Sequence, residues 1–295
     1  MEDLFALFGK FEGSFFMNTD VNQKIWIEKI HQNLILRGRS NHTFINYRSP
    51  LLRFFKYYAS NTDIEKLKEN DIIDFLNHEF IIPNKCKKTY NIAVCSIRLF
   101  YLVCFNISLN RILLPTSKLS KKLPTIINKD LFIKIVNDEK HLKYKCWLLL
   151  GYCSGLRVSE VARVKVEDIS FQNHNLKVLG KGNKERITIL PNIVFKALNI
   201  YCIKNNIKSG YIFKGSNSKP FMNEKTIINY FSVIKDLYNL DDNISFHSLR
   251  HSFATYYLVH GGSLIKLQFM LGHNSLATTS IYLHLTQNFD KVYHA

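Results

Sequence analysis

The spacing of apolar residues predicts helices through most of the first hundred residues. Between residues 21 and 36, isoleucine and leucine recur at the three- and four-residue intervals of a helix face, and Gly38 is placed to end the helix. The same spacing predicts a second helix capped by Ser40, a third opened by Asn70 and a fourth over residues 85–103. Helices of this kind form a small bundle.

The second half of the chain mixes helical spacing with one hairpin pattern. Residues 175–190, NLKVLGKGNKERITIL, predict two strands joined by a glycine-rich turn. Asp130 is expected to cap the first helix of this half. The chain is thus predicted to be mainly α with a small β-sheet, built as a helical bundle followed by an α+β domain. Helical spacing surrounds the hairpin, over residues 131–136, 144–154, 194–203 and 223–234, and in a last run from His247 that the glycine pair at 261–262 is expected to end.

Composition shifts divide the chain into two domains. Residues 1–17 are rich in phenylalanine and are assigned no function. The helical domain is expected over residues 18–114 and the α+β domain over residues 130–295. Residues 115–129 carry two prolines and four lysines without a long apolar stripe, which is typical of a linker. A chain of 295 residues is long enough for two domains, each with its own core.

The charge of the chain favours a polyanionic partner. Lysine and arginine number 40 against 23 aspartate and glutamate, which gives a formal net charge of +17 and a pI near 9.5. No apolar run approaches the roughly 20 residues that span a bilayer, and the start, MEDLF, lacks the basic residues of a signal peptide. Six cysteines without a CxxC pair fit reduced thiols. We therefore expect a cytoplasmic protein that binds nucleic acid and no membrane.

The candidate chemistry gathers near the C-terminal end. His247 and Arg250 are three residues apart, so a helix would project them from one face, where both could touch one phosphate. A glycine turn then presents His273, and a short helix carries Tyr282. Arginine is a fixed fork of donors suited to phosphate oxygens, and histidine donates or carries protons near neutral pH. The pattern predicts a tyrosine held near an arginine and two histidines.

Three motifs in this stretch, H-x-L-R-H-x-x-A-T, L-G-H and I-Y-x-H, resemble in order and spacing the C-terminal signature of the tyrosine recombinases, the phage integrase and Xer-like family. G-L-R-x-S-E at residues 155–160 matches another element of that family. The resemblance implies a clamp around DNA, in which residues 18–114 are the core-binding domain and residues 130–295 the catalytic domain. It implies a site-specific recombinase that cleaves and rejoins DNA through a 3′-phosphotyrosine, in integration, excision or resolution.

The resemblance also implies a role for each candidate residue. Tyr282 would attack a DNA phosphodiester. Arg157, Arg250 and His273 would stabilise the charge on the non-bridging oxygens of that phosphate. His247 would accept the tyrosine proton or hydrogen-bond the phosphate.

Lys181 and Glu160 are the less specific members of the set. The family places a lysine on the hairpin as the proton donor to the leaving 5′-oxygen, and Lys181 stands at that position, although Lys184 lies three residues away. Glu160 is placed to orient an arginine. The alternative is an ordinary surface glutamate in a first helical turn.

No metal or cofactor is expected. The sequence has no G-x-x-x-x-G-K-[ST] loop and no paired carboxylates near the basic residues to bind catalytic magnesium. His247 and His251 have the spacing of the H-E-x-x-H zinc motif, but Ser248 stands where that motif needs glutamate. His251 is expected instead to be a buried hydrogen-bonding residue. Phosphoryl transfer would then rest on side chains alone.

The partner that the resemblance implies is double-stranded DNA with inverted-repeat half-sites, bound by a homo-oligomer, a tetramer, with room for a second recombinase or an accessory protein. Two other functions stay open. A type IB topoisomerase shares the arginine, histidine and tyrosine chemistry but relaxes DNA as a monomer. A non-catalytic DNA-binding protein would need one of the key residues lost, and none is. The sequence leaves open whether the role is chromosome resolution, phage integration or transposition of a mobile element.

Overall fold

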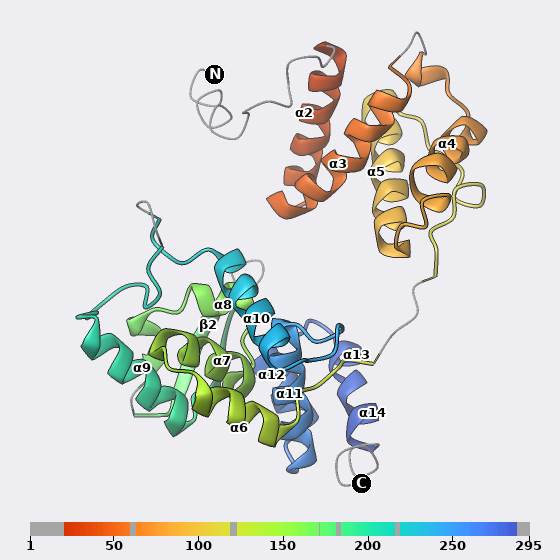
Figure 1. The fold of residues 1–295 in the computed structure, drawn as a ribbon. Coiled ribbons are helices and arrows are strands. Elements are labelled where there is room, and N and C mark those ends of the chain that lie inside the picture. The colour runs from red at the N-terminus through yellow and green to blue at the C-terminus, as the bar shows by residue number, and fades with distance from the viewer. Residues whose placement is uncertain are drawn as a thin grey trace. The chain divides into compact units, whose positions relative to one another are not determined.

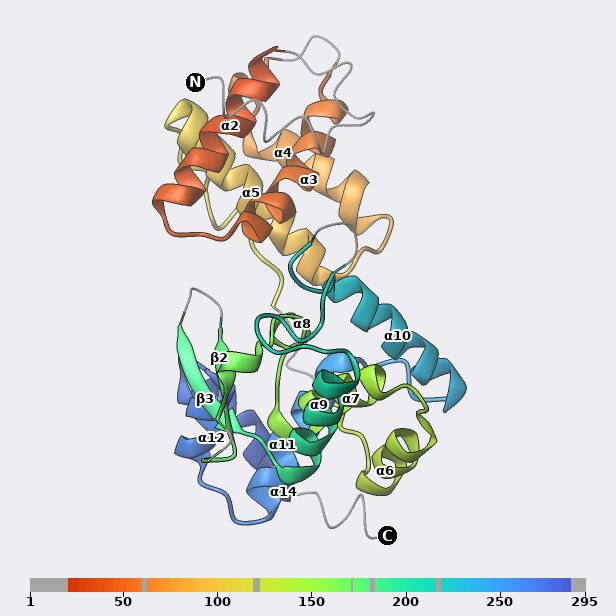
Figure 2. The same cartoon turned by 90° about the vertical axis from the view of Figure 1, so that its left-hand side faces the viewer.

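A computed structural model of the chain describes residues 21–59, 63–118, 123–170, 172–180, 184–215 and 219–287. The chain divides into two compact units, with the division between residues 121 and 122. The described residues are mostly helical and contain one three-stranded sheet, which confirms the predicted fold class. Figures 1 and 2 show the helices of the first unit and the mixed architecture of the second.

The described residues of the first unit form four helices and two short helical turns. The predicted helices are all present: α2 has the predicted bounds, α3 begins after Ser40, and α4 begins one residue before Asn70. Gly38, with φ of 64°, ends the turn after α2 as expected. The elements are α2 (Val21–Leu36), α3 (Asn41–Tyr57), η1 (Ile64–Lys66), α4 (Glu69–Leu76), η2 (Asn77–Ile81) and α5 (Lys87–Phe105).

Aromatic rings fill the interior of this unit. Phe54 on α3 is fully buried, and its ring centroid lies 5.3 Å from that of Tyr58 and 5.1 Å from that of Phe75, both edge-on. Tyr101 on α5 is also buried and donates its hydroxyl hydrogen to the carbonyl of Ile64 at 2.7 Å. Edge-to-face rings add attraction beyond the area that they bury. Ring pairs therefore contribute to the stability of this core in addition to the burial of apolar area.

In the second unit, helices pack around a small antiparallel sheet. The strands lie in the order β1-β2-β3, and residues 175 and 189 are paired in the register of the hairpin. The predicted hairpin is confirmed, whereas β1 is two residues long and was not predicted, because so short a strand shows no alternation. The elements are α6 (Lys129–Asp138), α7 (Leu142–Ser154), α8 (Val158–Ala162), η3 (Val166–Asp168), β1 (Ile169–Ser170), β2 (Asn175–Leu179), β3 (Glu185–Ile189), α9 (Asn192–Lys204), α10 (Glu224–Leu237), α11 (Phe246–Val259), α12 (Leu264–Leu271), α13 (Leu276–Thr279) and α14 (Ile281–Gln287).

One predicted helix cap is wrong. Asp130 does not cap α6, because Asn128 is the N-cap residue and its side chain accepts a hydrogen bond from the Asp130 backbone nitrogen at 2.8 Å. An acidic residue in the first turn is still favourable, since it faces the positive end of the helix dipole. The two residues are two positions apart, so apolar spacing alone does not distinguish them.

Two glycines let α7 and α11 lie side by side, as Figure 1 shows. A Cβ atom on Gly151 would stand 2.9 Å from Leu249, and one on Gly155 would stand 2.4 Å from the ring of Phe253. Gly155 also has a φ of 68° and ends α7 in the left-handed conformation that glycine favours. Because of this close approach, the residues just after α7 lie beside the first turns of α11.

Candidate active site

Glu160 is the centre of a cluster of arginines. It stands three residues after Arg157, the N-cap of α8, and accepts a hydrogen bond from the Arg157 backbone nitrogen at 2.7 Å, which is half of a capping box. Its side chain is only 4% exposed. Both of its oxygens accept hydrogen bonds from the Arg186 guanidinium at 2.7 Å, and Arg157 Nη1 donates to Oε1 at 2.8 Å. Arg250 Nη1 lies 3.7 Å from Oε2.

This environment keeps Glu160 ionised. Burial by itself would raise the pKa of the Glu160 carboxyl, but the hydrogen bonds and the charge of Arg186 outweigh it and lower that pKa below its usual range. One carboxylate therefore stands among three guanidinium groups, so positive charge is in excess. Arg157 keeps 32% of its side chain exposed, which leaves part of its guanidinium turned away from Glu160. The cluster is suited to bind an anion at that side.

Arg250 is buried and tied to two helix ends. Its side chain is 1% exposed, Nη1 donates to the carbonyl of Gly155 at 2.7 Å, and Nη2 donates to the carbonyl of Leu271 at 2.5 Å. Gly155 and Leu271 stand at the C-terminal ends of α7 and α12, where carbonyls lack helical partners and carry partial negative charge. Burial, followed by the charge of Arg157, lowers the pKa of Arg250 to about 9, so the group is still charged at neutral pH.

His273 follows α12 and faces Arg250. The C-cap of α12, Gly272, has a φ of 64°. His273 Nε2 lies 3.3 Å from Arg250 Nη2 and Nδ1 lies 3.0 Å from Thr279 Oγ1. Because arginine can only donate, Nε2 accepts and Nδ1 carries the hydrogen that it donates to Thr279. Burial and the charge of Arg250 lower the pKa of His273 to about 4, which leaves it neutral at pH 7.

Tyr282 lies on α14 inside a small apolar cluster with residues of α11 and α12. It is 2% exposed, and its hydroxyl lies 2.9 Å from His251 Nδ1 on α11. Its ring is stacked with that of His273 at a centroid distance of 6.5 Å. Burial raises the pKa of the Tyr282 hydroxyl, while the charges of Arg250 and Arg157 lower it.

His247 is an exposed residue of the first turn of α11, one turn before His251. Its ring meets that of His251 edge-on, with centroids 4.5 Å apart. Together with Arg157 it lines a hollow of about 430 Å³ between α8, α10 and the start of α11. Burial lowers the pKa of His247, and the charges of Arg250 and Arg157 lower it further. An anion in this hollow could reach both a guanidinium and an imidazole.

The structure thus brings six of the seven sequence-predicted residues to one place in the second unit. Lys181 lies outside the described residues. The strands on either side of it end at Leu179 and begin again at Glu185. The six are Arg157, Glu160, His247, Arg250, His273 and Tyr282.

Arg186 is a member of the cluster that the sequence analysis missed. It bonds both Glu160 oxygens, and its Nε donates to the carbonyl of Met270 at 2.7 Å, so it connects β3 to α8 and α12. A Cβ atom on Gly272 would stand 2.8 Å from Arg186 Cδ, so the turn before His273 closes on this side chain. Strand alternation would have placed Arg186 outward, opposite Ile187, whereas the structure buries Thr188 on the same face as Arg186, so the sequence carried no local signal for it.

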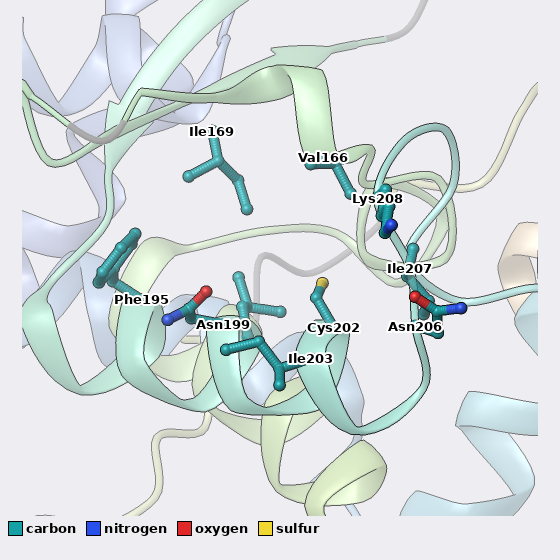
Figure 3. Close-up of a pocket in the computed structure, with 10 residues that line it drawn as sticks. Val166, Ile169, Phe195, Asn199, Cys202, Ile203, Asn206, Ile207 and Lys208 are labelled. Carbon is teal, nitrogen blue, oxygen red and sulfur yellow. The ribbon is translucent and has the colours of Figure 1, made fainter.

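A second hollow, of about 350 Å³, lies between β1 and α9 and contains none of these residues. Figure 3 shows that it is lined mainly by apolar side chains, among them Ile169, Phe195 and Ile203. Within the residues that the structure describes, no group of three or more histidine, cysteine or acidic side chains could hold a metal ion. Across the same residues, no helix is both long and apolar enough to cross a membrane.

Comparison with known proteins identifies the family. The sequence model of the phage integrase family matches residues 127–288, and that of the phage integrase N-terminal SAM-like domain matches residues 30–102. The tyrosine recombinase XerD of Oceanobacillus iheyensis is 30% identical over 277 residues, which are 86% of this chain and 91% of that protein. The tyrosine recombinase XerA of Pyrococcus horikoshii is 31% identical over 273 residues, which are 90% of each.

Solved structures show the same fold. The XerH site-specific recombinase bound to a palindromic difH substrate superposes with a TM-score of 0.73 at 20% identity, over 88% of this chain and 82% of that one. A lambda integrase dimer bound to a core site superposes with a TM-score of 0.68 at 19% identity, over 86% of this chain and 96% of that one. The chain therefore belongs to the phage integrase family of tyrosine recombinases, the enzymes that cut and rejoin DNA strands in site-specific recombination.

Proposed function

We propose that this recombinase cuts DNA by attack of the Tyr282 hydroxyl on a backbone phosphate. The products are a 3′-phosphotyrosine and a free 5′-hydroxyl, and attack by the 5′-hydroxyl of another strand then releases Tyr282 and completes an exchange. The observation that carries the proposal is the place of this hydroxyl. It is buried beside a cluster in which arginines outnumber carboxylates, in a chain whose family consists of tyrosine recombinases.

Arg157, Arg250 and His273 are proposed to hold the non-bridging oxygens of the phosphate. Arg250 is fixed by two carbonyls and His273 by Thr279, which aligns both groups before the phosphate binds. His273 Nδ1 donates to Thr279, so Nε2 must take up a proton and exchange its contact with Arg250 for one with a phosphate oxygen. Glu160 is proposed to orient Arg157 through their 2.8 Å ion pair.

His247 and Lys181 are proposed to carry the proton transfers of the reaction. His247, which lines the same hollow as Arg157, would accept the proton of the attacking Tyr282 hydroxyl or hydrogen-bond the phosphate. Lys181, carried over from the resemblance on the hairpin, would protonate the 5′-oxygen as it leaves.

The proposed substrate is double-stranded DNA with inverted-repeat half-sites, held between a core-binding domain of residues 18–114 and a catalytic domain of residues 130–295, joined by the linker of residues 115–129. The net charge of +17 suits such a polyanion. A palindromic DNA site matches the two-fold symmetry of a pair of bound chains. The solved XerH complex contains a palindromic substrate, which supports this symmetry. We propose that four copies complete the exchange, with a second recombinase or an accessory protein able to join them.

A covalent-trapping experiment tests the nucleophile. Fragments of the source genome, including repeats that flank the coding sequence, are incubated with the protein in EDTA, because no proposed step uses a metal. Wild type should leave a protein–DNA adduct on a denaturing gel, and Tyr282→Phe should bind the same DNA without adduct. Adduct formed by the Tyr282→Phe protein would move the nucleophile elsewhere.

The same DNA distinguishes the alternative functions. A recombinase joins strands from two duplexes, whereas a type IB topoisomerase-like enzyme relaxes a supercoiled plasmid without joining them. A non-catalytic DNA-binding protein gives neither product. Joined strands from two labelled duplexes are the expected result.

A further inference from the structure

Arg186 fits a slot between the ends of β2 and α12. Its side chain is 8% exposed. A Cβ atom on Gly180, the residue after β2, would stand 3.3 Å from Arg186 Nη1, and one on Gly272, the C-cap of α12, would stand 2.8 Å from Arg186 Cδ. A side chain at either position would crowd the arginine. The two glycines therefore leave a space that the planar guanidinium fills.

Each guanidinium nitrogen of Arg186 has a hydrogen-bond partner in this slot. Nη1 and Nη2 donate to the two oxygens of Glu160, each at 2.7 Å, and Nε donates to the carbonyl of Met270 at 2.7 Å. Met270 lies in the last turn of α12, where carbonyls lack helical partners. Two parallel bonds to a carboxylate fix direction as well as distance. The arginine therefore holds α8 against the end of the helix that His273 follows.

Glu160 is shared between Arg186 and Arg157. A carboxylate has roughly four acceptor positions. Arg186 uses two of them, and Arg157 uses two others, through Nη1 at 2.8 Å and through its backbone nitrogen at 2.7 Å. Arg157 is thus held by one side-chain bond, and part of its guanidinium stays exposed. Without Arg186, the carboxylate would have room for a bidentate pair with Arg157, which would draw that guanidinium away from a phosphate.

We propose that Arg186 is a positioning residue for DNA cleavage, which holds Arg157 and the turn that carries His273 at the separation at which both reach one phosphate. This inference rests on the proposed roles of Arg157 and His273 at that phosphate. Arg186 acts through Glu160 on one side and through Met270 on the other. A displacement of about 1 Å in groups that position a substrate can cost about 10²-fold in rate.

Two replacements of Arg186 and one control test this role. Arg186→Lys keeps the charge but loses the planar fork that spans Glu160 and Met270. Arg186→Met removes the charge as well. Thr188→Val is the matched control, because Thr188 is buried on the same face of β3 and donates to a backbone carbonyl, that of Ser154, at 2.8 Å.

The rate measured is single-turnover adduct formation with protein in excess. The substrate is a nicked form of the DNA that gives adduct in the trapping experiment, from which the short fragment with the new 5′-hydroxyl diffuses away. We expect Arg186→Lys and Arg186→Met each to lower this rate by about 10–10²-fold with little change in DNA affinity. Thr188→Val should match wild type. The circular dichroism melt checks that each variant is folded, and Arg186→Lys alone carries the test if Arg186→Met does not fold.

Double-mutant cycles separate positioning from a general loss of stability. Arg186→Lys is combined with Arg157→Lys and, separately, with His273→Ala. If Arg186 acts by aligning these two groups, its replacement should cost less in each background than in wild type, by more than about threefold. Sites that act independently have effects that multiply to within about twofold.

Three results overturn the inference. They are an Arg186→Lys rate within about threefold of wild type, a Thr188→Val loss as large as that of Arg186→Lys, and a cost of Arg186→Lys that falls by less than about threefold in either background. An Arg157→Lys protein that cuts at the wild-type rate, or a wild-type protein that forms no adduct at Tyr282, overturns the proposed function as well. A wild-type adduct that Arg157→Lys slows, combined with any of the three results, overturns the role of Arg186 alone.

Discussion

The two units fill their interiors with different chemistry. The first unit packs rings against rings, and Ser96 is its one fully buried polar side chain among the described residues. The second unit has an apolar core around α7 as well, but next to it lie the ionised side chains of Glu160 and Arg250, 4% and 1% exposed. Its other buried polar residues are Ser154, Thr188, Ser248, Ser252, Thr255 and Thr279.

The difference shows which interior is built for stability and which for chemistry. An apolar ring gives up no hydrogen bonds to water when it is buried, so ring contacts in the first core stabilise the fold. A buried ion pair recovers its desolvation cost only through good geometry and full hydrogen bonding. The carboxylate of Glu160 has that geometry, but apolar residues of similar size would stabilise a fold at least as well. Excess guanidinium groups in the interior therefore point to an anion that binds there.

The largest expected effect comes from neutralising the one carboxylate. Glu160→Gln has nearly the same shape, but it leaves Arg157, Arg186 and Arg250 without an anion. We expect the second unit to lose about 3–5 kcal/mol, the usual cost of breaking a buried pair. Adduct formation should also slow by about 10²–10³-fold, because the arginines lose their alignment. Hydrogen exchange read by mass spectrometry, separately for peptides of α5 and α7, measures the stability of each unit.

The matched control is Glu224→Gln, which removes a carboxylate from an exposed pair. Arg163 Nη2 and Glu224 Oε1 are 3.2 Å apart, and their side chains are 51% and 38% exposed. Such pairs contribute about 0–1 kcal/mol. Equal losses of stability from the two substitutions would contradict the contrast between the units. So would a Glu160→Gln protein in which the exchange rate of α7 rises less than about tenfold more than that of α5.

The same contrast explains how much of the fold the sequence predicts. Apolar spacing predicts α2 with its observed bounds, and the prediction for α5, residues 85–103, is two residues early at each end of Lys87–Phe105. These helices each bury one apolar face. In β3 the pattern reverses: Ile187 is 59% exposed, whereas Thr188 is 1% exposed. The inner face of that strand meets the polar cluster, so hydrophobicity there indicates the wrong side.

For the candidate site, motif spacing predicts which residue types gather but not the bonds between them. Arg186, which donates to both oxygens of Glu160, is 26 residues away from it in the sequence. Arg250 and the Gly155 carbonyl to which it donates are 95 residues apart. Motif spacing left open that Glu160 is an ordinary surface glutamate, whereas in the structure it is buried. The contact between His251 and Tyr282 depends on how α14 packs on α11, which no local pattern contains.

A second prediction concerns the free energy of unfolding of the second unit, which should fall at acidic pH. The pKa of His251 is lowered to about 3 and that of His273 to about 4 from an ordinary 6.5. Between those values the unfolded chain binds more protons than the folded one, so stability falls as the pH drops from about 6.5 toward 4. Each histidine contributes a slope of up to about 1.4 kcal/mol per pH unit. Glu160, whose pKa is lowered from 4.5, adds a further loss below that pH.

Urea unfolding of the second unit at a series of pH values measures this slope, with hydrogen exchange in α7 as the readout. His251→Asn removes one of the titrating groups, so its slope should be shallower than that of wild type. A variant whose stability depends on pH as steeply as wild type would show that His251 is not one of the groups responsible.

The smallest expected effect is a change in the aromatic core of the first unit. Phe54→Leu keeps an apolar side chain in a fully buried position and removes one ring from its edge-on pairs with Tyr58 and Phe75. We expect a loss of about 1–2 kcal/mol, because leucine fills most of the space but forms no ring pairs. Exchange of α5 amides in urea measures it. Ile45→Ala on the same helix is the control, since Ile45 is 56% exposed and such changes stay within about 0.5 kcal/mol.

This last substitution also asks whether the two interiors are separate in their energetics. Phe54 lies in a core that contains no residue of the candidate site, so the single-turnover adduct rate of fully DNA-bound Phe54→Leu protein should equal that of wild type. Exchange in α7 should not change either. If instead α7 loses as much protection as α5, the two units unfold together. The stability that Glu160 contributes to one would then support the rings of the other, and the contrast between a core for stability and a core for chemistry would fail.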